Sequence, residues 1–165
     1  MFVVPKRRVL AMVSVIALAI AACSSSPGSS GSPTGSPSAA GGAGATTVAV
    51  KLQEWSVNPA SDTAPAGSVT FQVTNDGPAD VHEFVVLKTD LDPGALPIDA
   101  NGAVTEAGEG IEVIDEIEDI PVGQTPELTV SLAAGKYVLL CNIYSESEKE
   151  AHYKMGMRVG FTVTE

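Results

Sequence analysis

The chain has 165 residues, which is enough for one domain with extensions but not for two full domains. It carries 20 acidic and 9 basic residues, a net charge of −11, and this balance excludes nucleic acid as a partner because phosphates are bound through Lys and Arg. The acidic balance is compatible with a protein that meets a basic partner.

The N-terminus has the features of a targeting signal. A basic region at residues 6–8 precedes an apolar stretch at residues 9–20, which is too short to span a bilayer. The stretch ends in Ile-Ala-Ala-Cys at residues 20–23 and resembles the lipobox of bacterial lipoproteins. The resemblance implies a signal peptide over residues 1–22, cleavage before Cys23 and a lipid on its sulfur. An ordinary secretory signal with a chance cysteine is the alternative.

The next segment, residues 23–45, is predicted to be a flexible linker. After the cysteine it consists almost only of Ser, Gly, Pro, Ala and Thr, and such a composition cannot bury a core. We therefore expect a single folded domain at residues 46–165. The lipid and the linker would hold this domain at the extracytoplasmic face of the cell membrane.

The domain is predicted to consist of strands. From Thr46 onward large apolar residues alternate with small or polar ones, as in residues 48–52 and 69–73, and the second run stops at the turn sequence Asn-Asp-Gly-Pro of residues 75–78. Later β-branched runs occupy residues 82–87, 111–120, 128–130, 136–141 and 159–163. Short strands at such spacing predict an all-β, antiparallel sandwich.

Three other stretches carry separate expectations. Asp90 to Gly110 is predicted to be a long surface excursion, and Glu146 to Lys154 is the one stretch with helical tendency. The acidic run at residues 112–119 is interpreted as a strand with a solvated face rather than as a metal site. No carboxylate pair and no nucleophile–base set points to catalysis, so we expect a protein that is not an enzyme.

The chemistry is concentrated in a few sulfur and imidazole side chains. With Cys23 assigned to the lipid, Cys141 is unpaired in an oxidising compartment, where it is either a buried, inert thiol or a metal ligand. The only two histidines are His82, which opens a predicted strand, and His152; Met157 follows five residues later. Two imidazoles, one thiolate and a weak thioether make the trigonal site that favours copper.

The ordered motifs resemble those of the cupredoxins, the blue-copper proteins, over residues 48–163. The opening strand and its Pro-Ala-Gly turn at residues 65–67, the segment VHEFVV, the segment GKYVLLCNI and the segment HYKMGM follow the order of that family. The resemblance implies a Greek-key β-sandwich that carries one electron at a time through a single copper ion. The ligands that it implies are His82, Cys141, His152 and Met157.

The chain departs from the family between its last ligands. Close relatives have only a few residues between the cysteine and the second histidine, whereas here Asn142 to Ala151 intervene and residues 144–150 look inserted. Loop closure entropy grows slowly with length, so His152 still reaches the metal, with a looser geometry expected. The insertion brings three acidic residues to the electron exit that the resemblance implies at His152, and these are Glu146, Glu148 and Glu150.

Several alternatives remain open from the sequence. The three glutamates form either a solvated loop or a docking surface for a basic redox protein, such as a cytochrome or a membrane oxidase domain. The long loop favours a copper storage, delivery or resistance protein, and the methionine ligand favours an electron carrier. A metal-free interaction module is the third alternative.

Zinc suits this donor set less well than copper, and a dinuclear copper site would need two cysteines in the loop. Met155 is expected to pack beside the site, leaving Met157 as the axial ligand.

Overall fold

The computed structural model describes residues 45–165. The predicted signal peptide, the lipidation site at Cys23 and nearly all of the linker lie outside the described residues. Within the described part of the chain, no helix is both long and apolar enough to cross a membrane.

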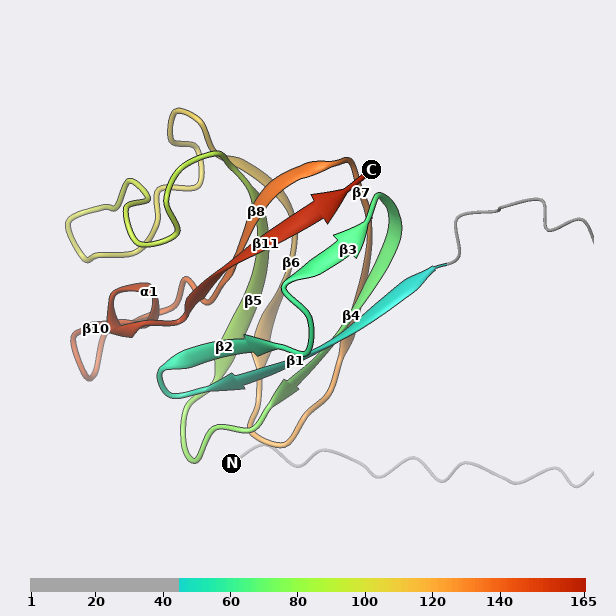
Figure 1. Cartoon of the computed structure of the whole chain (residues 1–165). Coiled ribbons are helices and arrows are strands. Elements are labelled where there is room, and N and C mark those ends of the chain that lie inside the picture. Colours follow the sequence, from blue (N-terminus) through green and yellow to red (C-terminus); the bar gives the residue numbers. More distant parts are fainter. Residues whose placement is uncertain (1–44) are drawn as a thin grey trace, which may run out of the picture. The chain divides into compact units, whose positions relative to one another are not determined.

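The described residues form two main sheets and one small hairpin (Figure 1). The first sheet has the order β2-β1-β4-β7, and its strands span Ser56–Pro59, Thr46–Gln53, Gly67–Asn75 and Glu127–Leu132. The second sheet has the order β3-β11-β8-β5-β6, and its strands span Thr63–Pro65, Arg158–Thr164, Gly135–Leu140, His82–Lys88 and Glu112–Ile120. Strands β9 (Tyr144–Ser145) and β10 (Glu150–Ala151) make the hairpin, which leads into the short helix α1 (His152–Met155).

The predicted all-β sandwich is confirmed, but its sheets are mixed rather than purely antiparallel. Strand β1 runs parallel to β4, and β3 runs parallel to β11. After the β1–β2 hairpin the chain crosses to the second sheet as β3 and returns as β4. This crossover lets β4 enter the first sheet in the same direction as β1.

The core between the sheets follows the alternation seen in the sequence. On β1, for example, Val48, Val50 and Leu52 are buried while the residues between them are exposed. At the centre of the core, Phe71 of β4 packs against two rings of the opposite sheet. The ring centroids lie 5.3 Å from Phe84 on β5 and 5.5 Å from Phe161 on β11. Large buried aromatic rings of this kind dominate core energetics, so they fix the two sheets against each other.

The long excursion between β5 and β6 contains no named strand or helix, as predicted for residues 90–110. Part of this excursion is buried, because Leu96 and Val104 belong to a second apolar cluster together with Tyr153 of α1. The hydroxyl of Tyr153 donates to the carbonyl oxygen of Pro93 at 2.8 Å and accepts the N–H of Leu96 at 3.0 Å. The excursion is therefore attached directly to α1.

The stretch predicted to be helical is mostly a hairpin. Strands β9 and β10 pair in antiparallel fashion, and only His152–Met155 are helical. The turn closes because the N–H of Lys149, at a φ of 62°, donates to the carbonyl oxygen of Ser145 at 2.8 Å. The inserted residues thus form a closed hairpin, and the chain returns from it at His152, close to Cys141.

Candidate metal centre

The position of His82 at the start of β5 is set by the turn that precedes it. The buried Asn75 organises this turn: its Nδ2 donates to the carbonyl oxygens of Asp80 and Ile120, both at 2.8 Å. Its Oδ1 accepts the N–H of Gly77 at 2.9 Å. His82 itself has 0% of its surface exposed, so the turn delivers an imidazole directly into the interior.

Cys141 follows the last residue of β8 and is fully buried. Its thiol sulfur accepts the backbone N–H of Glu83 at 3.3 Å, which joins the ends of β5 and β8. Its neighbour Asn142 holds the long excursion, because its Oδ1 accepts the N–H of Val104 at 2.6 Å and its Nδ2 donates to Glu106 Oε1 at 2.9 Å. These contacts give the sulfur a fixed backbone frame.

His152 is the first residue of α1 and is only 2% exposed. Its N–H donates to the carbonyl oxygen of Ile143 at 2.9 Å, immediately before the hairpin. The two ends of the inserted segment are thereby connected by a backbone hydrogen bond. The Trp55 ring packs edge-on against the imidazole, with ring centroids 5.1 Å apart.

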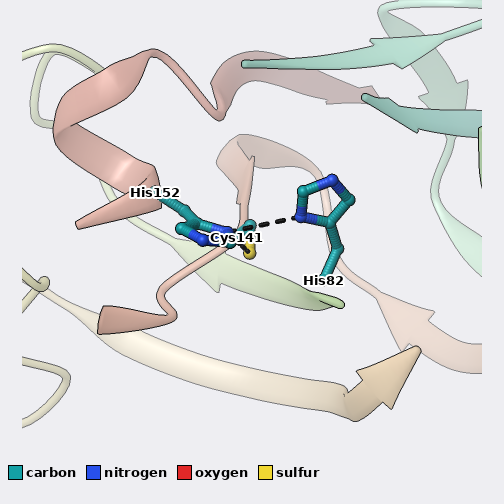
Figure 2. A group of neighbouring side chains, drawn as sticks. All are labelled: His82, Cys141 and His152. Carbon is teal, nitrogen blue, oxygen red and sulfur yellow. Dashed lines mark hydrogen bonds between the residues drawn. The ribbon is translucent and has the colours of Figure 1, made fainter. Parts of the chain in front are cut away.

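The structure brings His82, Cys141 and His152 together at one end of the sandwich, with their side chains pointing toward one another (Figure 2). The two Nδ1 atoms lie 3.3 Å apart, and the thiol sulfur lies 3.4 Å from Nδ1 of His152. One donor atom from each residue fits within 4.8 Å of the others. Two imidazole nitrogens and one sulfur at these distances form a donor set that suits a transition-metal ion.

The two late methionines occupy different environments. Met157 is 0% exposed and belongs to the core cluster that includes Cys141, whereas Met155 is 43% exposed. The backbone of Met157 contacts two of the predicted ligands: its N–H donates to the carbonyl oxygen of His152 and its carbonyl oxygen accepts the N–H of Cys141, both at 3.0 Å. Met155 does not pack into the site as expected, because the one-turn helix directs it to solvent.

Burial sets the protonation of the three clustered side chains. Removal from water raises the pKa of the Cys141 thiol to about 12, although the N–H of Glu83 acts in the opposite direction. Burial also lowers the pKa of His82, with a further contribution from His152, and it lowers the pKa of His152 itself. At neutral pH the metal-free centre is therefore an uncharged thiol with two neutral imidazoles.

Two residues of the β1–β2 turn contact the centre and were missed by the sequence analysis. Trp55 packs against His152, and its carbonyl oxygen would lie 2.8 Å from a Cβ at residue 156, where Gly156 has a φ of 130°.

Glu54 lies behind His82, with Oε1 3.9 Å from Nε2. Burial opposes the ionisation of Glu54, but hydrogen bonds from the N–H groups of Asp80 and Ala79 outweigh it and lower its pKa. No local pattern in the sequence marks either Trp55 or Glu54 as part of the centre.

A group of carboxylates borders the centre on another side. Glu83, Glu106 and Glu116 bring one oxygen each within 4.8 Å of the others. Burial, followed by the charges of Glu116 and Glu106, raises the pKa of Glu83 to about 7. Glu116 belongs to the acidic run interpreted as a solvated strand face, and it is half-buried rather than fully solvated.

A surface hollow of about 260 Å³ opens beside His152. Its lining includes three acidic residues from different segments, which are Asp80, Asp119 and Glu148. Of the glutamates predicted to form a docking surface, Glu148 lines the hollow, Glu146 pairs with Lys149 at 2.8 Å, and Glu150 is half-buried. Asp80 and Asp119 join this acidic rim through folding, because they are distant from the insertion in the sequence.

Comparison of structures places the fold among known proteins. The structure is similar to a dithionite-reduced auracyanin from the photosynthetic bacterium Roseiflexus castenholzii, with 24% identity, a TM-score of 0.53, and coverage of 73% of this chain and 98% of that one. It is also similar to auracyanin B, with 20% identity, a TM-score of 0.51, and coverage of 73% and 90%. No protein-family model and no curated protein sequence matches the chain. The chain thus has the cupredoxin fold that its motifs predict.

Proposed function

We propose that the protein is a one-electron carrier built around a single copper ion. The observation that carries the proposal is the convergence of one donor atom each from His82, Cys141 and His152 within 4.8 Å of one another, with Nδ1 of His152 3.3 Å from Nδ1 of His82 and 3.4 Å from Sγ of Cys141. The donor set fits copper because thiolate stabilises Cu(I) and imidazole suits both oxidation states. When bound, copper supplies the reversible exchange of one electron.

The protein's own residues supply the frame for that exchange. His82 and Cys141 project from neighbouring strands of one sheet, and the N–H of Glu83 links the sulfur to β5. His152 is held by its N–H bond to Ile143 and by Met157. Met157 is the proposed fourth, axial ligand. All four residues are buried, which favours retention of the ion and electron transfer over its release to another protein.

The test is the visible spectrum of the full chain after loading with Cu(II). A thiolate–copper bond predicts an intense blue or green charge-transfer band. Cys141→Ser should remove the band, whereas the matched variant Cys23→Ser, at the other cysteine, should retain it. A colourless wild-type protein with no bound copper by elemental analysis would leave a metal-free module as the function.

We also propose that the protein is anchored to the outer face of the cell membrane through a lipid on Cys23. The support is the lipobox-like sequence at residues 20–23 followed by the low-complexity linker. Cys23→Ser should block processing or release the protein from membranes. Mass spectrometry of the mature N-terminus that finds no acyl group would rule out the anchor.

The proposed redox partner is a basic protein or oxidase domain that meets the acidic rim of the hollow beside His152. Three carboxylates line that hollow, and opposite charges raise encounter rates between proteins. The chain's net charge of −11 supports the same choice of partner. Kinetic measurements at varied salt test this proposal and are described below.

A further inference from the structure

The second ring nitrogen of His82 has no assigned role in the proposed copper site. Nε2 lies on the side of the ring away from His152 and Cys141 (Figure 2). It is buried without a hydrogen-bond partner, and the same is true of Oε2 of Glu54. The Glu54 carboxylate approaches Nε2 to 3.9 Å through its other oxygen. Because unpartnered buried polar atoms are costly, their juxtaposition calls for a physical explanation.

The Glu54 carboxylate is held in place by the turn that also positions His82. Its Oε1 accepts the N–H groups of Asp80 at 2.7 Å and Ala79 at 3.2 Å. On another side it lies against Gly77, where an added Cβ would come within 2.6 Å of Oε2. The absence of a side chain at Gly77 therefore leaves the space that the carboxylate occupies.

We propose that Glu54 is a positioning residue for the metal centre, whose carboxylate faces Nε2 of His82 across 3.9 Å and favours the ring proton at that nitrogen. This contact fixes the ring with Nδ1 directed toward Cys141 and His152, and it places a negative charge behind the imidazole. The effect of Glu54 on the reduction potential rests on the proposed copper function. The effect of Glu54 on which ring nitrogen of His82 carries the proton can be measured in the metal-free protein and is independent of that function.

The chemistry of imidazole explains why an acceptor is needed at this point. Nδ1 of His82 offers a lone pair to a metal only when the ring proton is on Nε2. Histidine ligands generally donate that proton to a carboxylate, carbonyl or water, which orients the ring and makes it a stronger donor. In the metal-free protein the same assignment makes Nδ1 of His82 an acceptor. In the hydrogen bond between the two Nδ1 atoms, which lie 3.3 Å apart, His152 is then the donor and carries its ring proton on Nδ1.

Glu54 also holds the backbone of residues 79 and 80, so the test must separate positioning from a merely structural role. Glu54→Gln does this, because the amide oxygen can retain both backbone N–H bonds while the negative charge is lost. Asp76→Asn is the matched control. This control removes a carboxylate from the turn at residues 75–80, which Glu54 contacts. The Asp76 carboxylate pairs with Lys51 at 2.8 Å instead of approaching His82.

The first measurement is the reduction potential of the copper-loaded full chain, together with the thermal midpoint of the metal-free form. Glu54→Gln should weaken Cu(II) binding about tenfold with little change in Cu(I) binding. For one electron that factor raises the potential by about 59 mV. Asp76→Asn should leave the potential near the wild-type value, and both variants should keep the charge-transfer band and the thermal midpoint. Equal potentials for the two variants would overturn the role assigned to Glu54.

The second measurement needs no copper. Long-range ¹H–¹⁵N spectra of the metal-free wild-type protein should show His82 protonated at Nε2 and His152 protonated at Nδ1. An Nδ1-protonated His82 would overturn the inference, whatever the variants do. A wild-type protein that binds no copper would overturn the proposed function instead, while these spectra would still decide where the His82 proton resides.

Discussion

The carbonyl oxygen of Met157 accepts the backbone N–H of Cys141 at 3.0 Å, so β8 and the segment after α1 are joined at the metal centre itself. The N–H of Met157 donates to the carbonyl oxygen of His152 over the same distance. One backbone unit therefore sets the spacing between the thiol and an imidazole. Met157 combines this backbone role with a fully buried side chain in the same core cluster as Cys141.

Met157→Leu should raise the reduction potential while the charge-transfer band persists. The substitution removes a weak thioether donor that stabilises Cu(II), and it changes the side-chain volume little, so the cost in folding free energy should stay below about 1.5 kcal/mol. A tenfold loss in relative Cu(II) affinity would appear as a rise of about 59 mV. Voltammetry of the copper-loaded protein measures the shift.

Met155→Leu is the matched control for that experiment, because Met155 lies two residues earlier and is 43% exposed. Its potential and spectrum should equal those of the wild type. If Met155→Leu moves the potential and Met157→Leu does not, the axial ligand is Met155 rather than Met157.

Metal binding should release about one proton per ion at neutral pH. Burial raises the pKa of the Cys141 thiol to about 12, so a cation must displace its proton, whereas His82 and His152 have lowered pKa values and are already neutral. Affinity should therefore rise about tenfold per pH unit between pH 7 and 9. Zn²⁺ is a suitable probe because it does not oxidise the thiol, and a Cys23→Ser background leaves a single cysteine.

Competition titrations at several pH values give the slope, and calorimetry in buffers of different ionisation enthalpy counts the protons. In the Cys141→Ser variant the slope should fall to near zero. A wild-type affinity that does not change with pH would mean that Cys141 is already ionised in the metal-free protein.

The Glu83, Glu106 and Glu116 group should make the metal-free protein less stable as pH rises. The folded state raises the pKa of Glu83 from 4.5 to about 7, so it favours the protonated carboxyl. The stabilisation is fully present below about pH 4.5 and is lost as pH rises through about 7. Glu116→Gln removes a like charge, and it should stabilise the protein at pH 8 by about 1 kcal/mol or less after solvent screening.

Thermal denaturation at pH 5 and pH 8 tests this expectation. Glu127→Gln, on an exposed position of β7 in the other sheet, should leave the difference between the two midpoints unchanged. If Glu116→Gln also leaves the difference unchanged, the three carboxylates do not interact in solution.

Local patterns in the sequence were enough to predict most strands and the identity of the clustered side chains. Strict alternation in β1 and β4 reflects one buried face, and the lone cysteine and two histidines left few choices for a metal site. Strands β2 and β3 were not predicted because each is short and irregular. The hairpin in the insertion was also missed, since its turn depends on Lys149 at positive φ rather than on a Gly or Asn signal.

The surroundings of the centre were harder to predict because they assemble from distant segments. Glu54 reaches His82 only when the β1–β2 turn folds over the turn at residues 75–80. Asp80 and Asp119 reach Glu148 across the hollow for the same reason. No local periodicity encodes such contacts between loops, whereas buried faces of strands produce a period of two in the sequence.

Electron transfer to a cationic acceptor should slow as salt rises, because Asp80, Asp119 and Glu148 give the hollow beside His152 a negative rim. Salt screens exposed charges over about 8 Å near physiological ionic strength. Oxidation of the reduced, copper-loaded protein by the cationic oxidant tris(1,10-phenanthroline)cobalt(III) should therefore be fastest at low salt. The opposite dependence is expected with ferricyanide, an anionic acceptor. The appearance of the charge-transfer band after stopped-flow mixing measures both rates.

Replacing Glu146, Glu148 and Glu150 together by Gln should slow the reaction with the cation at low salt and flatten its salt dependence, with no change in the copper spectrum. Glu148→Gln should account for most of the effect, because only Glu148 of the three lines the hollow. Glu146→Gln is the matched control, since Glu146 is already paired with Lys149 at 2.8 Å. Equal rates for wild type and Glu148→Gln at every salt concentration would mean that electrons leave the protein by another face.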